Sequence, residues 1–175
     1  MRKLKNSELE RKTLGEFKGA KKSPFVVVLD NVRSFNNIGS VFRTSDAFLV
    51  EAIYLCGITA TPPHKDIQKT ALGATESVGW KYFKTTETAI NTLKEKGYFI
   101  ISIEQAEKAI PLRNYTTERH QKYALVFGHE VKGVSQKIVD LSDACIEIPQ
   151  FGTKHSFNIA VSVGIVLWEF YNKLQ

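Results

Sequence analysis

The sequence predicts a single α/β domain built on a parallel β-sheet that is covered by helices on both faces. Its 175 residues, 43% of them hydrophobic, are enough for one compact core and too few for two. Apolar runs rich in β-branched residues alternate with stretches of helical character. Several of these runs are apolar on both faces, which is typical of parallel strands covered on two sides.

Five runs predict strands, because they combine β-branched or aromatic residues with the length of a strand. Four stretches of helical character lie between or after these strands. The expected strands cover residues 25–30, 51–57, 98–104, 123–128 and 143–149. The expected helices cover residues 38–48, 86–96, 135–141 and 156–174.

The segment 57–80 is expected to be irregular. Pro62 and Pro63 predict a turn within it. One short helix is expected over residues 66–72, ending before Gly73. No internal repeat or low-complexity linker divides the chain, so residues 23–175 are expected to form one domain.

The positive charge is concentrated at the N-terminus. The formal net charge is +6. Residues 1–22 hold eight Lys or Arg and three Glu, which gives +5, and the remaining sixteen basic and fifteen acidic residues give +1. A basic N-terminal arm of this kind suits contacts with a phosphate backbone. The alternative is a solvated helix, because charges of both signs are interspersed in "NSELERKTLGEF".

Cysteine usage and hydropathy favour a cytoplasmic protein with no membrane partner. Cys56 and Cys145 lie inside apolar runs without a CxxC or a nearby ligand-forming residue, so buried free thiols are expected ahead of a disulfide or a metal site. The longest apolar run, 159–168, is interrupted by Ser162 and Gly164 and is too short to cross a bilayer. The charged N-terminus lacks the apolar core of a secretory signal.

Glycines and polar residues gather where three predicted strands end. The segments are "LDNVRSFNNIG", "FGHEVKG" and "IPQFGTKHSFN". Because ligands bind at the carboxyl ends of strands in an open parallel sheet, these segments form the expected binding site. The chain contains no GxGxxG, GxxxxGK[ST], HExxH or GxSxG motif and no metal-ligand spacing. A cofactor would therefore be held by another loop geometry, and no metal is expected.

These three segments, in this order, resemble the motifs of the SpoU/TrmH family of RNA ribose 2′-O-methyltransferases, within the SPOUT superfamily. One motif alone would be weak evidence, but three in order are strong, and the resemblance runs from about residue 25 to the end. The first motif matches at Asn37 and Arg43, the second at Gly128, Glu130 and Gly133, and the third at Ile148, Pro149, Gly152, Ser156 and Asn158.

The resemblance implies a parallel-sheet SPOUT fold with a C-terminal trefoil knot, S-adenosylmethionine as the cofactor and RNA as the partner. Main-chain atoms of the second and third motifs are expected to bind the cofactor, with two apolar side chains enclosing the adenine. The implied catalytic residues are Asn37, Arg43, Glu130, Ser156 and Asn158, and the implied cofactor-binding residues are Gly128, Ile148, Gly152 and Phe157.

Arg43 is implied to contact the substrate ribose or phosphate and to help deprotonate the 2′-hydroxyl. An arginine is an unfavourable base, since its pKa normally lies above ~12. Orienting the hydroxyl and stabilising developing charge is the role that its chemistry supports. From the residues alone, a structural ion pair between Arg43 and Asp46 is an equal alternative.

Helix capping is an alternative role for the asparagines and the serine. Asn36 or Asn37 would suit the N-cap of the first helix, and Ser156 or Asn158 would suit the N-cap of the last one. Capping and catalysis are compatible for Ser156 and Asn158. Capping does not explain Arg43, which lies two turns into the first helix.

The second motif also has an ordinary structural explanation. Gly133 and Ser135 suit a strand-to-helix turn. That explanation does not account for the carboxylate of Glu130 between two glycines. His129 stands where many family members carry asparagine or a small residue, and it is expected to tune the loop without acting as a general base.

Small residues recur every four positions in the last predicted helix, at Ser156, Ala160 and Gly164. Such a row permits close helix–helix approach. Packing against the domain's own sheet is the default expectation. The resemblance favours a homodimer, with this helix and the first helix at the interface.

The predicted activity is transfer of a methyl group from S-adenosylmethionine to a ribose 2′-hydroxyl of RNA. A tRNA is favoured over rRNA, because family members that act on rRNA often carry a separate RNA-binding domain. A non-catalytic RNA-binding or ribosome-assembly protein of the same fold stays open, although the complete motif set argues against it. A flavodoxin-like or nucleotide-binding enzyme unrelated to RNA is the other alternative, and a preference for S-adenosylmethionine over flavin or ATP would exclude it.

Overall fold

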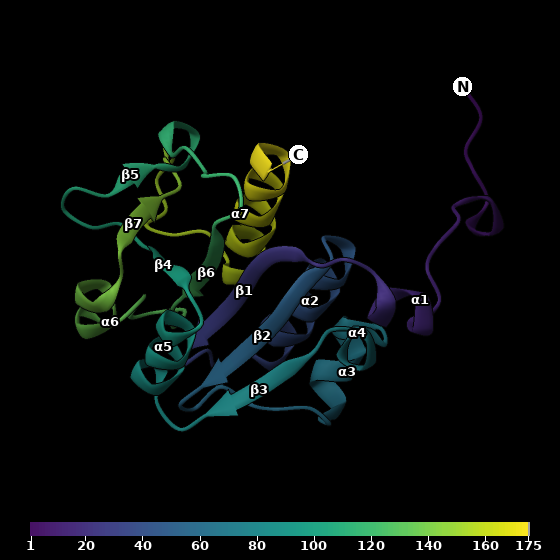
Figure 1. Ribbon diagram of the computed structural model, residues 1–175, viewed down its shortest axis with the longest axis horizontal. Helices are drawn as coiled ribbons and strands as arrows, with labels where there is room; N and C mark the ends of the chain where they lie inside the picture. Colours follow the sequence, from purple (N-terminus) through teal and green to yellow (C-terminus); the bar gives the residue numbers. More distant parts are fainter. Residues whose placement is uncertain (175) are drawn as a thin grey trace.

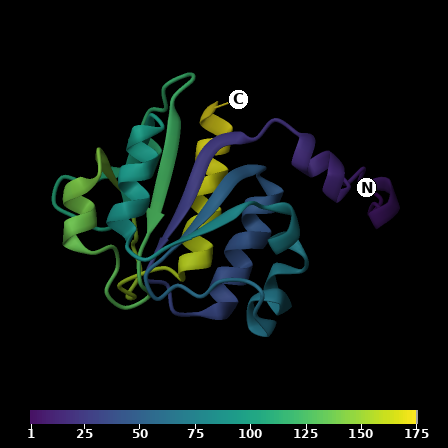
Figure 2. The ribbon, with the colours of Figure 1, turned by 60° about the horizontal axis from the view of Figure 1, so that its bottom comes forward.

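The computed structural model describes residues 1–174 and shows a seven-stranded sheet. The strand order is β3-β2-β1-β6-β4-β7-β5, and every neighbouring pair is parallel. Figures 1 and 2 show helices on both sides of this sheet. The strands are β1 (Ser23–Asp30), β2 (Val50–Cys56), β3 (Trp80–Phe83), β4 (Tyr98–Ile103), β5 (Ile110–Pro111), β6 (Lys122–Phe127) and β7 (Ala144–Glu147).

All five predicted strands and all five predicted helices are present, each within three residues of its expected ends. The predicted α/β class with a parallel sheet is therefore confirmed. The α-helices are α1 (Leu14–Gly19), α2 (Phe35–Ala47), α3 (Lys65–Ala71), α4 (Ala74–Ser77), α5 (Thr86–Glu95), α6 (Gln136–Leu141) and α7 (Ile159–Leu174), and two 3₁₀ turns cover Asn6–Glu8 and Leu112–Asn114.

Two strands and a helical turn were not expected from the sequence. The segment 57–80 is not irregular throughout, because it ends at the start of β3, where Trp80 pairs with Ile53 of β2. The strand is only four residues long and is largely exposed, so it lacks the apolar run that marks the buried strands. The two-residue strand β5 and the four-residue helix α4 are too short to carry a periodic signal.

Alternating residues of β1 build two separate cores, one on each face of the sheet. Val27 and Leu29 belong to the cluster that includes the buried faces of α2, α3 and α7. Val26 and Val28 belong to the cluster that includes the buried faces of α5 and α6. Because successive side chains of a strand point to opposite faces, a run apolar at every position is what this two-sided burial requires.

The helices α2 and α3 approach each other closely at Gly39. A Cβ at this position would lie 2.1 Å from Thr70 Oγ1 and 2.2 Å from the Ile67 carbonyl oxygen. Within the chain, the predicted row of small residues on the last helix does not bring a neighbouring helix this close. Ser156 precedes α7, and a Cβ at Gly164 would make only an ordinary contact, 4.0 Å from Thr44 Cγ2.

The chain changes direction across the sheet between β1 and β6. The strands β2 and β3 continue on one side of this pair, and β4, β7 and β5 continue on the other. In open α/β sheets, ligands bind outside the carboxyl ends of the strands at such a switch point. The segments that follow β1 and β6 therefore meet where a ligand is expected.

The N-terminal arm is attached to the domain through its second half. Figure 1 shows the first residues extending away from the body. Thr13 caps α1 by accepting a hydrogen bond from the Glu16 backbone N–H, and Phe17 of α1 is buried in the core cluster around α2. None of the helices within residues 1–174 combines the length and the apolar character that crossing a membrane requires.

Gly39→Ala is expected to lower the free energy of unfolding by about 1–3 kcal/mol, because the added methyl group meets the backbone of α3. Gly164→Ala is the matched control. It also replaces a helical glycine, but the added methyl group would meet no atom closer than 4.0 Å. Because alanine favours the helix more than glycine does, the free energy of unfolding should stay unchanged or rise by up to ~1 kcal/mol. Urea unfolding of both variants measures the difference, and equal effects would contradict the tight α2–α3 contact.

Candidate active site

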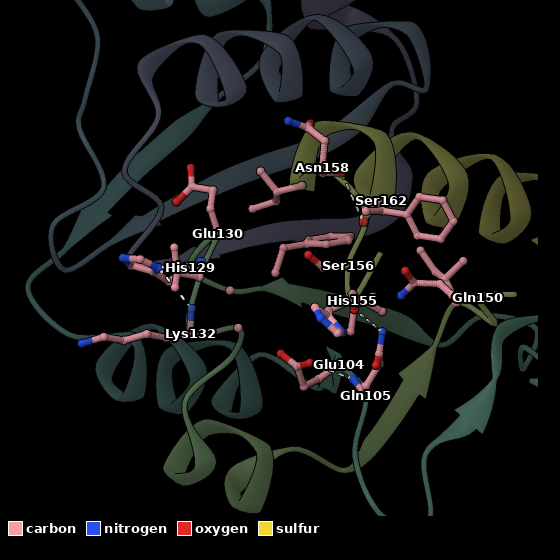
Figure 3. Close-up of a pocket in the computed structure, with 18 residues that line it drawn as sticks. Glu104, Gln105, His129, Glu130, Lys132, Gln150, His155, Ser156, Asn158 and Ser162 are labelled. Carbon is pink, nitrogen blue, oxygen red and sulfur yellow. Dashed lines mark hydrogen bonds between the residues drawn. The ribbon is translucent and has the colours of Figure 1, made fainter. Parts of the chain in front are cut away.

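A cavity of about 470 Å³ opens at the carboxyl ends of β4, β6 and β7, beside the start of α7 (Figure 3). Its walls are formed by residues 103–105, the loop after β6, and the segment between β7 and α7. Six of the nine predicted site residues line it. These are Gly128, Glu130, Ile148, Ser156, Phe157 and Asn158.

A hydrogen-bonded network at the edge of this cavity joins all three sequence motifs. Asn37 Nδ2 donates to Glu130 Oε1 at 3.2 Å, and Asn37 Oδ1 accepts from Asn158 Nδ2 at 3.1 Å. Asn37 does not line the cavity itself, but it connects two residues that do. Figure 3 shows the Glu130 carboxylate and the Asn158 amide turned towards the same side of the cavity.

The carboxylate of Glu130 is held by the two residues that directly precede α2. Its oxygens accept hydrogen bonds from the backbone N–H groups of Arg33, at 3.0 Å, and Ser34, at 2.9 Å. Partial burial is the largest single influence and acts to raise the pKa of Glu130, but these donors and the Asn37 amide together outweigh it and hold the pKa below its usual value. Glu130 is therefore an ionised anchor and a poor proton acceptor.

The donors and acceptors of the network have one consistent order. A carboxylate can only accept, so the Asn37 amide must turn its NH₂ group to Glu130 and its oxygen to Asn158. Asn158 Oδ1 in turn accepts from the Ala160 backbone N–H at 2.9 Å. Asn37 and Asn158 each keep one further amide N–H that can serve a ligand.

The structure decides between the capping alternatives. The side chain of Ser34 caps α2 by accepting from the Asn37 backbone N–H, so neither Asn36 nor Asn37 is the N-cap. Asn158 does cap α7, which starts at Ile159 and not at Ser156 as the sequence suggested. Asn158 is thus both the cap of α7 and a member of the network.

The glycines of the second motif allow the loop to fold back on itself. His129 and Gly133 form a backbone bridge with N···O distances of 3.0 and 2.8 Å. A Cβ at Gly128 would lie 2.1 Å from the Gly133 carbonyl carbon and from the Val134 nitrogen. The nearest atoms are thus protein backbone, and Gly128→Val would disrupt the loop before it touched a ligand.

Two predicted residues lie away from the cavity. Gly152 is exposed and has no atom within 4 Å of an added Cβ. Arg43 is exposed and lines a second groove, about 590 Å³, between the N-terminal arm and the helices α2 and α4. Within residues 1–174 its guanidinium forms no ion pair, so the alternative pair with Asp46 is not present.

The residues that follow β4 also belong to the site, although no motif of the sequence includes them. Glu104 Oε2 accepts from the Val134 backbone N–H at 2.7 Å, and Gln105 Nε2 donates to the His155 carbonyl at 3.0 Å. These contacts fasten the loop after β6 and the segment before α7 to the same strand end. The polar pair Glu104-Gln105 directly after an apolar strand was the available signal.

His129 shapes its own loop. Its Nδ1 accepts from the backbone N–H groups of Val131, at 3.0 Å, and Lys132, at 3.3 Å. This arrangement places the imidazole proton on Nε2. The contacts are those of a loop-shaping residue.

These features define a class, an α/β protein with a cavity at the carboxyl ends of the strands of a parallel sheet. The SpoU rRNA methylase family matches residues 24–168. The chain belongs to this family.

Similar proteins carry related descriptions. A tRNA (guanosine(18)-2'-O)-methyltransferase of Borreliella burgdorferi is 28% identical over 148 residues, which cover 85% of this chain and 66% of that protein. A TrmH/SpoU tRNA modifying enzyme of A. aeolicus has a TM-score of 0.80 at 25% identity, over 91% of this chain and 81% of that one. An AdoMet-bound rRNA methyltransferase from Sinorhizobium meliloti has a TM-score of 0.82 at 25% identity, over 91% of this chain and 60% of that one. The chain spans 58–67% of the length of the first curated relatives it matches.

Glu130→Gln is expected to lower stability at neutral pH, because an amide NH₂ would face the backbone N–H groups of Arg33 and Ser34. The pKa of Glu130 is lowered in the folded state, so the ionised group stabilises the fold fully above pH 4.5 and loses this contribution as pH falls through the lowered pKa. The difference from wild type should therefore shrink in acid.

Urea unfolding at pH 7 and at several values below pH 4.5 measures this difference. Glu107→Gln is the control, since Glu107 is exposed and forms no ion pair within residues 1–174. A difference for Glu130→Gln that stays constant with pH would show that ionisation of this carboxyl contributes nothing.

Proposed function

We propose that this protein transfers a methyl group from S-adenosylmethionine to a ribose 2′-hydroxyl of RNA. The observation that carries the proposal is the Glu130–Asn37–Asn158 network, which lies at the edge of the cavity and is anchored at the starts of two helices. Family membership supports the same chemistry.

The cavity suits S-adenosylmethionine. Its volume of about 470 Å³ falls within the usual range of small-molecule sites, ~300–1,000 Å³. Ile148 and Phe157 supply apolar walls for an adenine, and the backbone of residues 127–133 supplies main-chain polar groups. The carboxylate of Glu104 complements a ligand that carries positive charge at its sulfonium and amino groups. Gly152 lies outside the cavity lining, and we propose no cofactor contact for it.

When bound, S-adenosylmethionine supplies an electrophilic methyl group. The protein's residues mainly provide proximity and orientation for the attacking hydroxyl. The free amide N–H groups of Asn37 and Asn158 would hold a ribose or phosphate oxygen of the RNA. The exposed Ser156 hydroxyl lines the cavity and would accept a hydrogen bond from the 2′-hydroxyl, which assists loss of its proton.

The proposal includes a homodimer formed through α2 and α7. Val161 and Trp168 of α7 are large apolar residues that are 50% and 58% exposed, and Trp168 contacts Phe48 at the end of α2. Large apolar residues that are exposed seven positions apart on one helix suit an interface. In such a dimer, Arg43 on the exposed side of α2 would act at the cavity of the partner subunit. This explains how Arg43 can have a catalytic role although it does not line the cavity of its own chain.

A C-terminal trefoil knot is also part of the proposal. The strand β7 lies beyond β4, on the far side of β6 from β1, yet α7 packs in the core cluster with α2. The segment 148–158 therefore runs back along the carboxyl ends of the strands, past the loop that follows β6. Threading through that loop would produce the knot.

We further propose that the substrate is a tRNA and that the protein acts in the cytoplasm. Two of the similar proteins described above act on tRNA by their names, and the third acts on rRNA. The basic arm gives an additional surface for phosphate contacts.

Methyl transfer to purified tRNA and rRNA tests the function directly, with isotopically labelled S-adenosylmethionine as the donor. A methylated 2′-oxygen protects the adjoining phosphodiester from alkali, because the free hydroxyl is the attacking group. Label recovered in alkali-resistant dinucleotides and identified by nucleoside mass spectrometry is the expected result. Label only on bases, or no transfer to either RNA, would contradict the proposal.

Arg43→Ala is expected to abolish methyl transfer while leaving the fold and the affinity for S-adenosylhomocysteine unchanged, because Arg43 is exposed and outside the cavity. Mixing this variant with Asn158→Ala subunits should restore part of the activity, since one of the two sites in a mixed dimer would be intact. No recovery in mixed dimers, with each variant folded, would mean that Arg43 acts within its own chain or only structurally.

Removal of residues 2–12 is expected to weaken RNA binding and to reduce its salt dependence. This cut removes basic residues and leaves Thr13 and the buried Phe17 of α1 in place. The logarithm of the RNA-binding constant falls linearly with the logarithm of the salt concentration. The magnitude of this slope should decrease by ~0.7–0.9 for each phosphate that the shortened protein no longer neutralises. Filter binding across a series of salt concentrations measures the slope, and an unchanged slope would assign the arm to packing.

A further inference from the structure

Phe35 and His64 form an exposed aromatic pair. Their ring centroids are 4.0 Å apart and their planes differ by 7°, so the two rings are stacked. Phe35 is 37% exposed, and the side chain of His64 is 35% exposed. Neither residue belongs to the core clusters, and neither lines the cavity.

The pair lies at the same end of α2 as the hydrogen-bonded network. Phe35 is the first residue of α2 and directly follows Ser34, whose backbone N–H holds the Glu130 carboxylate. Asn37, the central residue of the network, is two residues further on. A group bound against Phe35 would therefore lie within about one helical turn of the proposed catalytic network.

The rings are held rigidly with respect to that network. His64 caps α3, and its Nδ1 accepts from the Asp66 backbone N–H at 3.2 Å. The hydroxyl of Thr70 on α3 donates to the Asn36 carbonyl at 2.9 Å, and Gly39 allows the two helices to approach closely. The pair thus loses little freedom when a further ring stacks on it.

Three cationic side chains lie close to the pair along the chain. Arg33 lies two residues before Phe35, and Lys65 and Lys69 follow His64 on α3. All three are exposed, and none forms an ion pair within the part of the chain from 1 to 174. Aromatic rings interleaved with basic side chains are the combination that binds single-stranded nucleic acid.

We infer that the Phe35–His64 pair is a stacking platform for an RNA base next to the nucleotide that is methylated. This inference rests on the proposed function. Stacking is tolerant of base identity, because every base has a π face. The pair therefore sets the register of the RNA strand on the enzyme, while Arg33, Lys65 and Lys69 hold the adjoining phosphates.

The test compares substitutions that separate aromatic character from apolar packing. Phe35→Leu keeps an apolar side chain and loses the ring, whereas Phe35→Trp keeps a ring. Phe35→Leu and His64→Ala should each weaken binding of unfractionated tRNA, or of total rRNA assayed in parallel, by about 5- to 150-fold, the factor expected for loss of one stacked base. Phe35→Trp should bind as wild type, and its added indole emission should be quenched by RNA.

Salt dependence separates the rings from the charges. Phe35→Leu should leave the logarithmic salt slope unchanged, while Lys65→Ala should reduce it by ~0.7–0.9. Trp80→Ala is the matched control, because Trp80 is 39% exposed but lies at the amino end of β3, away from the cavity. It should leave RNA binding unchanged.

Calorimetric titration with S-adenosylhomocysteine keeps the two proposals distinguishable. All variants should bind it as wild type does. A wild-type protein that binds neither RNA nor S-adenosylhomocysteine would overturn the proposed function. If the wild-type protein binds RNA, two results would overturn the stacking platform. One is that Phe35→Leu binds RNA as tightly as wild type. The other is that Phe35→Leu loses affinity for RNA and for S-adenosylhomocysteine together.

Discussion

The contact between the Glu130 carboxylate and the backbone at the entry to α2 is the interaction on which the rest of the site depends. The N–H groups of Arg33 and of the N-cap Ser34 both donate to a carboxylate that comes from a loop almost one hundred residues later in the chain. The carboxylate is ionised by the same contact, and it fixes the orientation of Asn37. Through Asn37 the start of α7 is fixed as well.

Close backbone approach is the second constraint, and it is separate from the polar network. Gly128 allows the loop after β6 to fold against its own residues 133 and 134, and Gly39 allows α3 to lie against α2. The first contact shapes the wall of the cavity. The second joins the two helices whose starts carry Phe35 and His64. Two glycines thus provide the close backbone contacts beside two different surfaces.

Much of the fold could be predicted from the sequence, because burial on both faces of a sheet leaves a direct pattern. The run Phe25–Val26–Val27–Val28–Leu29 is buried at every position, and it was recognised as a strand. The strand β3 was missed, since an exposed edge strand is not required to be apolar. The start of α7 was placed too early, because Ser156 and Asn158 are both acceptable caps and only the folded chain selects Asn158.

The sequence by itself determined the sheet class, the three polar strand ends and the residue types of the candidate site, because these follow from local patterns and motif spacing. Only the tertiary structure decided which of those residues meet. Asn37 and Asn158 are 121 residues apart and share a hydrogen bond, whereas Arg43, six residues from Asn37, faces a different groove. A helix turns by about 100° per residue, so six residues carry a side chain to another face of α2. The strand order, which no local pattern encodes, brings the distant residues together.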